Sequence, residues 1–214
     1  IYLISLQIRD LLNQIRNKKM NKSRIEAISD GIFAIIITVM LLELKIPEGQ
    51  GLYALKEELH LILSYILSFI YIGIYWNNHH HLFQIVKRTN GKILWVNLHL
   101  MFWLTMIPLT TGWSSHTNYA QIPTALYAFI LFMCSLSYRL LEKTLIKSEG
   151  EDSLVANLLG KDRKLFTSVC LYCTSIFLSF IDTRLTLLTL AVLAYFWFLP
   201  NKKIEKYFKE NQSN

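Results

Sequence analysis

One carboxylate and three kinds of hydrogen-bond donor lie near the ends of apolar stretches in this sequence. Asp30 lies about a turn and a half into an apolar segment, residues 25–44. A carboxylate among lipid chains is costly enough to be treated as a functional candidate, and it needs donors. Trp76, His79 and Asn97 carry indole, imidazole and amide N–H groups that could supply them. These residue types predict hydrogen bonds between helices that meet at one depth.

The same apolar segment carries a stripe of side chains that recur once per helical turn. A rotation of about 100° per residue brings six residues onto one face, with a seventh at its edge. Most such stripes face lipid or a protein core, so periodicity alone leaves the role of this one open. The stripe consists of Arg24, Ile28, Gly31, Ile35, Thr38 and Leu42, with Val39 at the edge.

Three consecutive histidines raise the question of a metal site. Neighbouring side chains on a helix diverge by about 100°, so His79, His80 and His81 cannot all reach one ion. We expect a structural hydrogen bond from His79, with His80 and His81 in an aqueous loop, and no metal or cofactor. Glu43 is either an interfacial carboxylate beside Lys45 or part of a vestibule that attracts cations.

The elements that would position these residues are six apolar helices. Only 17% of the 214 residues are charged and 53% are hydrophobic, whereas soluble domains carry roughly 25% charged residues. A bilayer core needs around 20 mostly apolar helical residues, which predicts an all-α integral membrane protein. The six predicted spans are residues 25–44, 59–77, 93–113, 122–141, 165–181 and 185–199.

The distribution of basic residues predicts the orientation in the membrane. With the N-terminus inside, 19 of the 22 Lys and Arg residues lie on the cytoplasmic side of these spans. The net charge of +7 therefore orients the chain and indicates no nucleic-acid partner. We expect both termini to be cytoplasmic, with an amphipathic extension at 1–19, the six-span unit at 20–200 and a basic cytoplasmic tail at 201–214.

At these residues the sequence resembles the transmembrane protein 175 potassium channels of lysosomes and bacteria. The family signature R-x-x-x-F-S-D appears as Arg24, Ile28, Ser29 and Asp30, with isoleucine in place of phenylalanine. The stretch 35–40 resembles the first helix of the family. The second predicted span ends in a pattern that resembles the family's second-span motif, formed by Trp76, His79, Leu82 and Phe83. The likeness covers roughly residues 20–200.

The resemblance implies a potassium-selective cation channel in which the first helices line a central pore. Carried over residue by residue, it places apolar constriction rings and the gate at Ile35, Val39 and Leu42, and a potassium-preferring hydroxyl layer at Thr38. One lining helix per chain cannot enclose a pore, so a closed ring is required, by analogy a homotetramer. Eukaryotic relatives hold two six-span repeats per chain, whereas this chain has one. We therefore expect a bacterial inner (plasma) membrane protein.

The resemblance also implies a structural network that holds the helices in register. Its six members are Arg24, Ser29, Asp30, Trp76, His79 and Asn97.

Two other classes of function stay open at this point. In a proton-coupled carrier or a proton-permeable pathway, Asp30 and His79 would titrate instead of holding helices together. Carriers usually show internal repeats and broken helices at mid-membrane. The sequence shows neither, and Pro108 is a lone candidate kink. An integral membrane enzyme would need a nucleophile, metal or paired-carboxylate motif, and none is present. We therefore expect a channel that conducts potassium and performs no catalysis.

Overall fold

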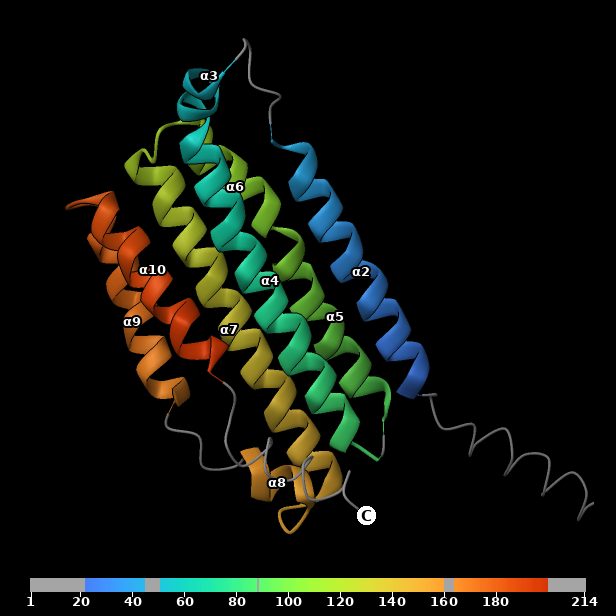
Figure 1. Cartoon of the computed structure of the whole chain (residues 1–214). Helices are drawn as coiled ribbons and strands as arrows, with labels where there is room; N and C mark the ends of the chain where they lie inside the picture. Colours follow the sequence, from blue (N-terminus) through green and yellow to red (C-terminus); the bar gives the residue numbers. More distant parts are fainter. Residues whose placement is uncertain (1–21, 45–50, 88, 160–163, 200–214) are drawn as a thin grey trace, which may run out of the picture.

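The computed structural model describes residues 22–44, 51–87, 89–159 and 164–199. Within these residues the chain is helical and forms one bundle, which confirms the predicted all-α class (Figure 1). The predicted N-terminal extension and C-terminal tail lie outside the described residues. The helices are α2 (Lys22–Leu42), α3 (Leu52–Glu57), α4 (Leu59–Ile85), α5 (Gly91–Thr105), α6 (Ile107–His116), α7 (Gln121–Glu149), α8 (Leu154–Leu159), α9 (Lys164–Leu178) and α10 (Thr183–Phe198).

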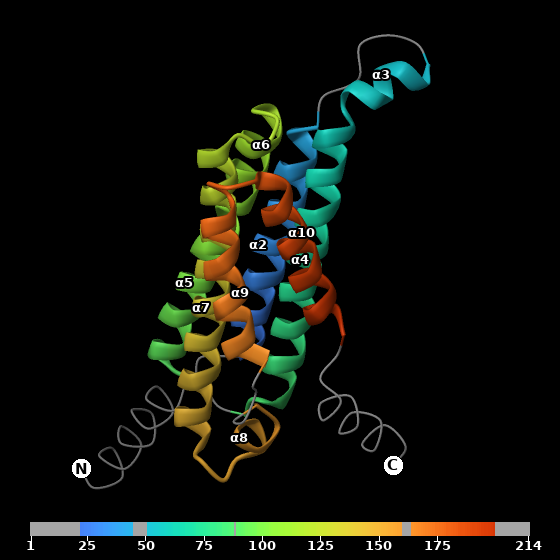
Figure 2. The same cartoon turned by 90° about the vertical axis from the view of Figure 1, so that its left-hand side faces the viewer.

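Four segments of the described chain are long and apolar enough to cross a membrane: α2, α4, the pair α5–α6, and α7. The two remaining apolar helices, α9 and α10, are shorter. Helix α7 packs against α5, α6, α9 and α10, whereas α2 lies at one edge of the bundle beside α4, α5 and α6 (Figures 1 and 2). The first helix is therefore attached to the bundle by one side.

The third predicted span consists of two helices. Helix α5 ends at Thr105 and α6 begins at Ile107, so the helix is interrupted at Met106. Pro108 lies in the first turn of α6, where its missing N–H leaves no partner unsatisfied. Pro108, the candidate kink in the sequence, therefore marks a real interruption.

Helices α9 and α10 form a tight hairpin. At the turn, the Asp182 carboxylate accepts a hydrogen bond from the backbone N–H of Arg184 at 2.9 Å and caps α10. At the other end, Lys164 Nζ donates to the carbonyl oxygens of Phe196 at 3.3 Å and Leu199 at 2.9 Å. Cation and carbonyl contacts of this kind stabilise the C-terminal end of a helix.

One expectation about the second span is wrong. Helix α4 extends to Ile85, so His80 and His81 lie within the helix and not in an aqueous loop. The helix continues through these polar residues because their side chains contact other side chains of the same helix. His80 Nε2 lies 2.7 Å from Gln84 Nε2, and the His80 ring stacks on the Trp76 indole with centroids 6.0 Å apart.

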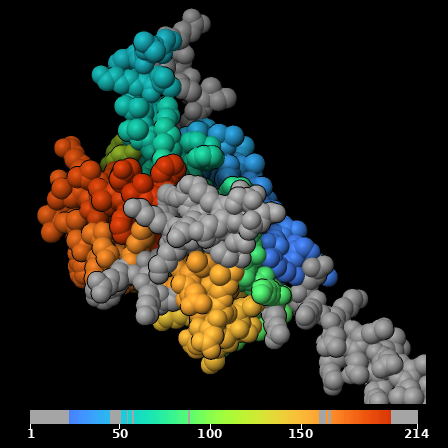
Figure 3. Space-filling view, turned by 60° about the horizontal axis from the view of Figure 1, so that its bottom comes forward, coloured from blue at the N-terminus to red at the C-terminus, as the bar shows by residue number. Residues whose placement is uncertain are grey.

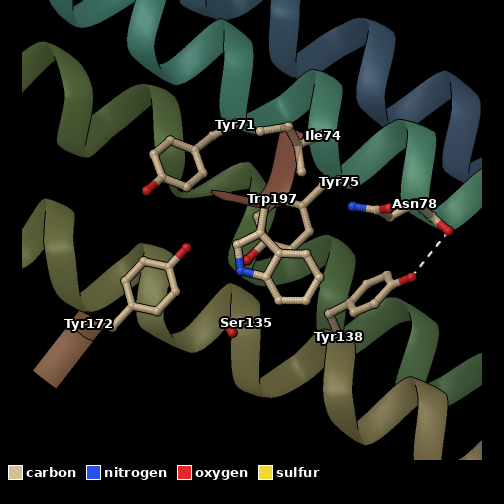
Figure 4. Close-up of a pocket in the computed structure, with 8 residues that line it drawn as sticks. All are labelled: Tyr71, Ile74, Tyr75, Asn78, Ser135, Tyr138, Tyr172 and Trp197. Carbon is tan, nitrogen blue, oxygen red and sulfur yellow. Dashed lines mark hydrogen bonds between the residues drawn. The ribbon is translucent and has the colours of Figure 1, made fainter. Parts of the chain in front are cut away.

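A cluster of tyrosines fills the space between α4, α7, α9 and α10. Figure 4 shows the hydroxyl groups of Tyr71, Tyr75 and Tyr172 turned toward one another across a small cavity. The Tyr71 hydroxyl donates to the Leu190 carbonyl at 2.7 Å, and the Tyr138 hydroxyl donates to the Asn78 carbonyl at 3.1 Å. Buried hydroxyls that bond across helices are a common means of joining helices in membranes.

Candidate functional site

Helix α2 buries one continuous face against the rest of the bundle. Its buried residues are spaced four, four, three and four apart, which is the spacing of a single helical face. This face contacts α4, α5 and α6. The buried residues are Ile25, Ser29, Phe33, Ile36 and Met40.

The opposite face of α2 is the predicted stripe, and nothing in the described part of the chain covers it. Leu42 is 83% exposed, Ile35 60% and Val39 42%. Thr38 and Gly31 are exposed between them. Figure 3 shows α2, in blue, along one flank of the molecule. The stripe predicted from the sequence is therefore not buried by the bundle.

Thr38 is the polar member of this exposed face. Its hydroxyl donates to the Ile35 carbonyl oxygen of its own helix at 2.9 Å. Because the hydroxyl hydrogen is used in this bond, the oxygen lone pairs remain as acceptors on the exposed side. An exposed oxygen of this kind is a possible partial ligand for a cation.

A chain of three hydrogen bonds joins the buried face of α2 to α5 and α4. Asn97 Nδ2 donates to Ser29 Oγ at 2.9 Å, and Ser29 Oγ donates to the Ile25 carbonyl at 2.8 Å. Asn97 Oδ1 lies 2.8 Å from His79 Nε2. Since the amide oxygen can only accept, His79 Nε2 is the donor. Ser29, His79 and Asn97 are all buried, so the chain is protected from water.

A second, more exposed contact joins α2 to α4. The Trp76 indole Nε1 donates to Asp30 Oδ1 at 3.0 Å. Trp76 is 45% exposed in the single chain. The structure therefore brings together five of the six predicted network residues in two clusters. Arg24 is the exception, because it lies on the exposed face and has no hydrogen-bond or ion-pair partner among the described residues.

Two contacts of α2 were not anticipated from the sequence. Lys22 Nζ donates to the carbonyl oxygens of Gln84 at 3.4 Å and Val86 at 3.2 Å, so Lys22 supplies the basic contact at the end of α4. At the other end of α2, the Glu43 carboxylate rests against Gly112 of α6. A methyl group on Gly112 would lie 3.0 Å from Glu43 Oε2. The C-terminal end of a helix attracts cations, so a basic residue could be expected at the end of α4. The sequence does not show which one, because Lys22 lies more than sixty residues away along the chain.

The described residues contain no group of three or more His, Cys, Asp or Glu side chains that could hold a metal ion. The arrangement holds α2 in place and sets the polarity of its exposed face. One face of α2 is held by a buried amide, an indole and a lysine, and the other face presents apolar side chains and one hydroxyl.

Comparison with known proteins identifies the family. The sequence profile described as "Endosomal/lysosomal potassium channel TMEM175" matches residues 24–108, which run from the start of α2 into α6. The chain is 47% identical over 192 residues to a potassium channel from Chryseobacterium sp. (strain P1-3), covering 90% of this chain and 100% of that relative. It is also 25% identical over 185 residues to the endosomal/lysosomal proton channel TMEM175 of Bos taurus, covering 78% of this chain and 39% of the relative.

A solved structure agrees with this assignment. The crystal structure of a lysosomal potassium-selective channel TMEM175 homolog from Chamaesiphon minutus matches this fold with a TM-score of 0.73 and 28% sequence identity. The match covers 86% of this chain and 100% of that one. The chain therefore belongs to the TMEM175 family, a family of ion channels and not of enzymes.

Proposed function

We propose that four copies of this chain form a potassium-selective channel whose central pore is lined by the exposed face of α2. One observation carries the proposal: the bundle buries one face of α2 and leaves the opposite apolar face, with its single hydroxyl, uncovered. The potassium channel from Chryseobacterium and the potassium-selective channel from Chamaesiphon minutus support the choice of ion. A ring of copies would enclose this face, because a single α2 cannot surround a pore.

The narrow part of the proposed pore is a set of apolar rings. Ile35, Val39 and Leu42 project from successive turns and span about 10 Å along the helix axis. Water leaves a narrow apolar neck readily, and a hydrated cation then meets a large barrier. A small rotation or outward shift of α2 would widen the neck and wet it. These three residues therefore act as both constriction and gate.

Potassium preference arises in this proposal from dehydration cost and from Thr38. Potassium loses its water more easily than sodium, so a neck that strips hydration favours potassium. The Thr38 oxygen, whose hydrogen is used by the Ile35 carbonyl, faces the same space and replaces part of the lost hydration. The network of Ser29, Asp30, Trp76, His79 and Asn97 sets the rotation of α2 and does not touch the ion.

The proposed orientation places both termini in the cytoplasm of a bacterial cell, with six crossings of the plasma membrane. Figures 1 and 2 support this count, because α2, α4, α5–α6, α7, α9 and α10 run in alternating directions. Helices α9 and α10, of 15 and 16 residues, are about 23 Å long and would complete the six crossings as a short hairpin.

The function is tested by reconstituting the purified full chain in a planar bilayer with potassium on one side and sodium on the other. We expect unitary currents whose reversal potential lies toward the potassium equilibrium potential. A reversal potential near zero with robust current would contradict the selectivity and keep the pore.

A second candidate is proton conduction or proton-coupled transport through Asp30 and His79. The vertebrate relatives that carry the name proton channel favour it. Against it, both side chains already bond between helices, Asp30 with Trp76 and His79 with Asn97. A reversal potential that follows the pH gradient, or slow flux without unitary currents, would favour this candidate over the potassium channel.

A further inference from the structure

One exposed face of α7 changes from apolar to basic along its length. Phe129, Leu136 and Leu140 are 39%, 37% and 46% exposed. Lys143 and Lys147 are exposed and continue the same face at helical spacing. Figure 2 shows this half of α7 between α5 and α9, which flank it. The surface is therefore apolar for about three turns and then cationic for about one.

Arg139 adds a third basic group beside this face, one turn before Lys143. Its Nη1 donates to Glu142 Oε2 at 3.0 Å, which is the only ion pair within the described ranges. Its Nε is buried and has no hydrogen-bond partner. Lys143 and Lys147 have no carboxylate partner in the part of the chain that the structure describes. Arg139 is therefore paired with Glu142, whereas the two exposed lysines have no carboxylate partner among the described residues.

The depth of these groups can be read from contacts at the end of α7. Asn90 Nδ2 donates to Ser148 Oγ at 3.2 Å, so the last turn of α7 is level with the connection between α4 and α5. Arg139 lies about 13 Å further along the helix. The basic groups therefore extend from the level of a polar loop toward the apolar part of the bundle, as the headgroup region of a bilayer does.

We infer that this face of α7 binds an anionic phospholipid in the leaflet near the α8 end of the bundle. The phosphate would lie against Lys143 and Lys147, with Arg139 as a further donor, and one acyl chain would follow Leu140, Leu136 and Phe129. A zwitterionic lipid carries its own cation and gains less from this surface. Cationic side chains near a membrane surface attract anionic lipids by about fivefold each in affinity. The inference does not rest on the proposed pore.

Native mass spectrometry of the full chain, titrated with phosphatidylglycerol in detergent, tests this site. Lys143→Gln/Lys147→Gln should weaken phosphatidylglycerol binding about thirtyfold. Lys143→Arg/Lys147→Arg should keep it, because the charges remain. The matched control is Lys56→Gln/Arg184→Gln, which removes two exposed charges, in α3 and in the first turn of α10, and should leave binding unchanged. Figure 1 shows α3 at the end of the bundle opposite α8.

Three results would overturn the inference. The first is equal affinity in the wild type and in Lys143→Gln/Lys147→Gln. The second is an equal loss in the control variant, which would mean that net charge alone attracts the lipid. The third is displacement of the bound lipid by millimolar inorganic phosphate, which would identify a site for a free anion and not for a lipid.

Discussion

At the scale of single residues, the amide of Asn97 does what no apolar side chain could do at that position. It donates to Ser29 on α2 and accepts from His79 on α4 while lying on α5, so one side chain fixes three helices. The ring centroids of Phe33 and Phe83 lie 5.9 Å and 4.6 Å from the centroid of the His79 ring, so the imidazole has aromatic neighbours as well. The rotation of α2 thus depends on a buried polar contact.

Replacing Asn97 with leucine should destabilise the chain because it leaves the buried His79 N–H without a hydrogen-bond acceptor. An unpaired buried donor costs about 1–3 kcal/mol. The midpoint of thermal unfolding in detergent should therefore fall in Asn97→Leu, whereas Asn77→Leu, at an exposed asparagine of α4, should change it little. Removing both partners in Asn97→Leu/His79→Phe should recover part of the loss. Equal effects of Asn97→Leu and Asn77→Leu would contradict the assigned bond.

The sequence could predict the types of these partners but not all of their identities. A carboxylate and a buried imidazole demand donors and acceptors, so Asp30, Trp76, His79 and Asn97 could be named in advance. Which basic residue reaches the end of α4 depends on helix phase. Arg24 lies on the exposed face, and Lys22, two residues earlier and on the other side of the helix, makes the contact.

At the scale of elements, the exposed arc of α2 has two unlike halves. Bulky side chains, Ile35 and Leu42 among them, occupy one half. Ala27 and Ala34 occupy the other, and Gly31 lies at the boundary between the halves, where an added methyl group would meet nothing within 4 Å. Small residues let membrane helices approach closely. In the proposed ring of four copies, the half with Ala27 and Ala34 would face the adjacent copy.

Ala34→Leu should therefore weaken assembly without disturbing the fold of the chain. The added bulk points away from the bundle of its own chain, since Ala34 is exposed. Light scattering of the detergent-solubilised protein should show a reduced share of tetramer. The matched control is Ala191→Leu, at an exposed alanine of α10. An unchanged tetramer fraction in Ala34→Leu, or the same loss in the control, would place the subunit contact elsewhere.

The helical spans were predictable because lipid imposes a strong and simple pattern, and their ends were less so. Helices α4 and α7 run to Ile85 and Glu149, beyond the predicted residues 77 and 141. Composition marks where apolar residues stop, whereas a helix continues as long as its polar side chains find partners. The interruption between α5 and α6 was foreshadowed by Pro108, since proline disrupts a helix in a known way.

At the scale of the whole molecule, the bundle fixes the position of one helix, α2, by contacts along one of its faces. Helix α2 lies at the edge of the bundle. Near one end it is held by the Lys22 contact and by the hydrogen bonds of Asn97, and at the other end Glu43 contacts α6. The face opposite these contacts is apolar and open. In the proposed channel, further copies cover that face, and a ring turns four such faces toward a common axis.

The unitary potassium conductance of Leu42→Ala tests this account most directly. Removing the most exposed side chain of the predicted constriction should widen the apolar neck and lower the dehydration barrier, so the conductance should rise severalfold. The control is Leu188→Ala, at a leucine of α10 that is 63% exposed and lies across the bundle from α2 (Figure 1), and it should leave the conductance unchanged. An unchanged conductance in Leu42→Ala, or an equal increase in both variants, would contradict a pore lined by α2.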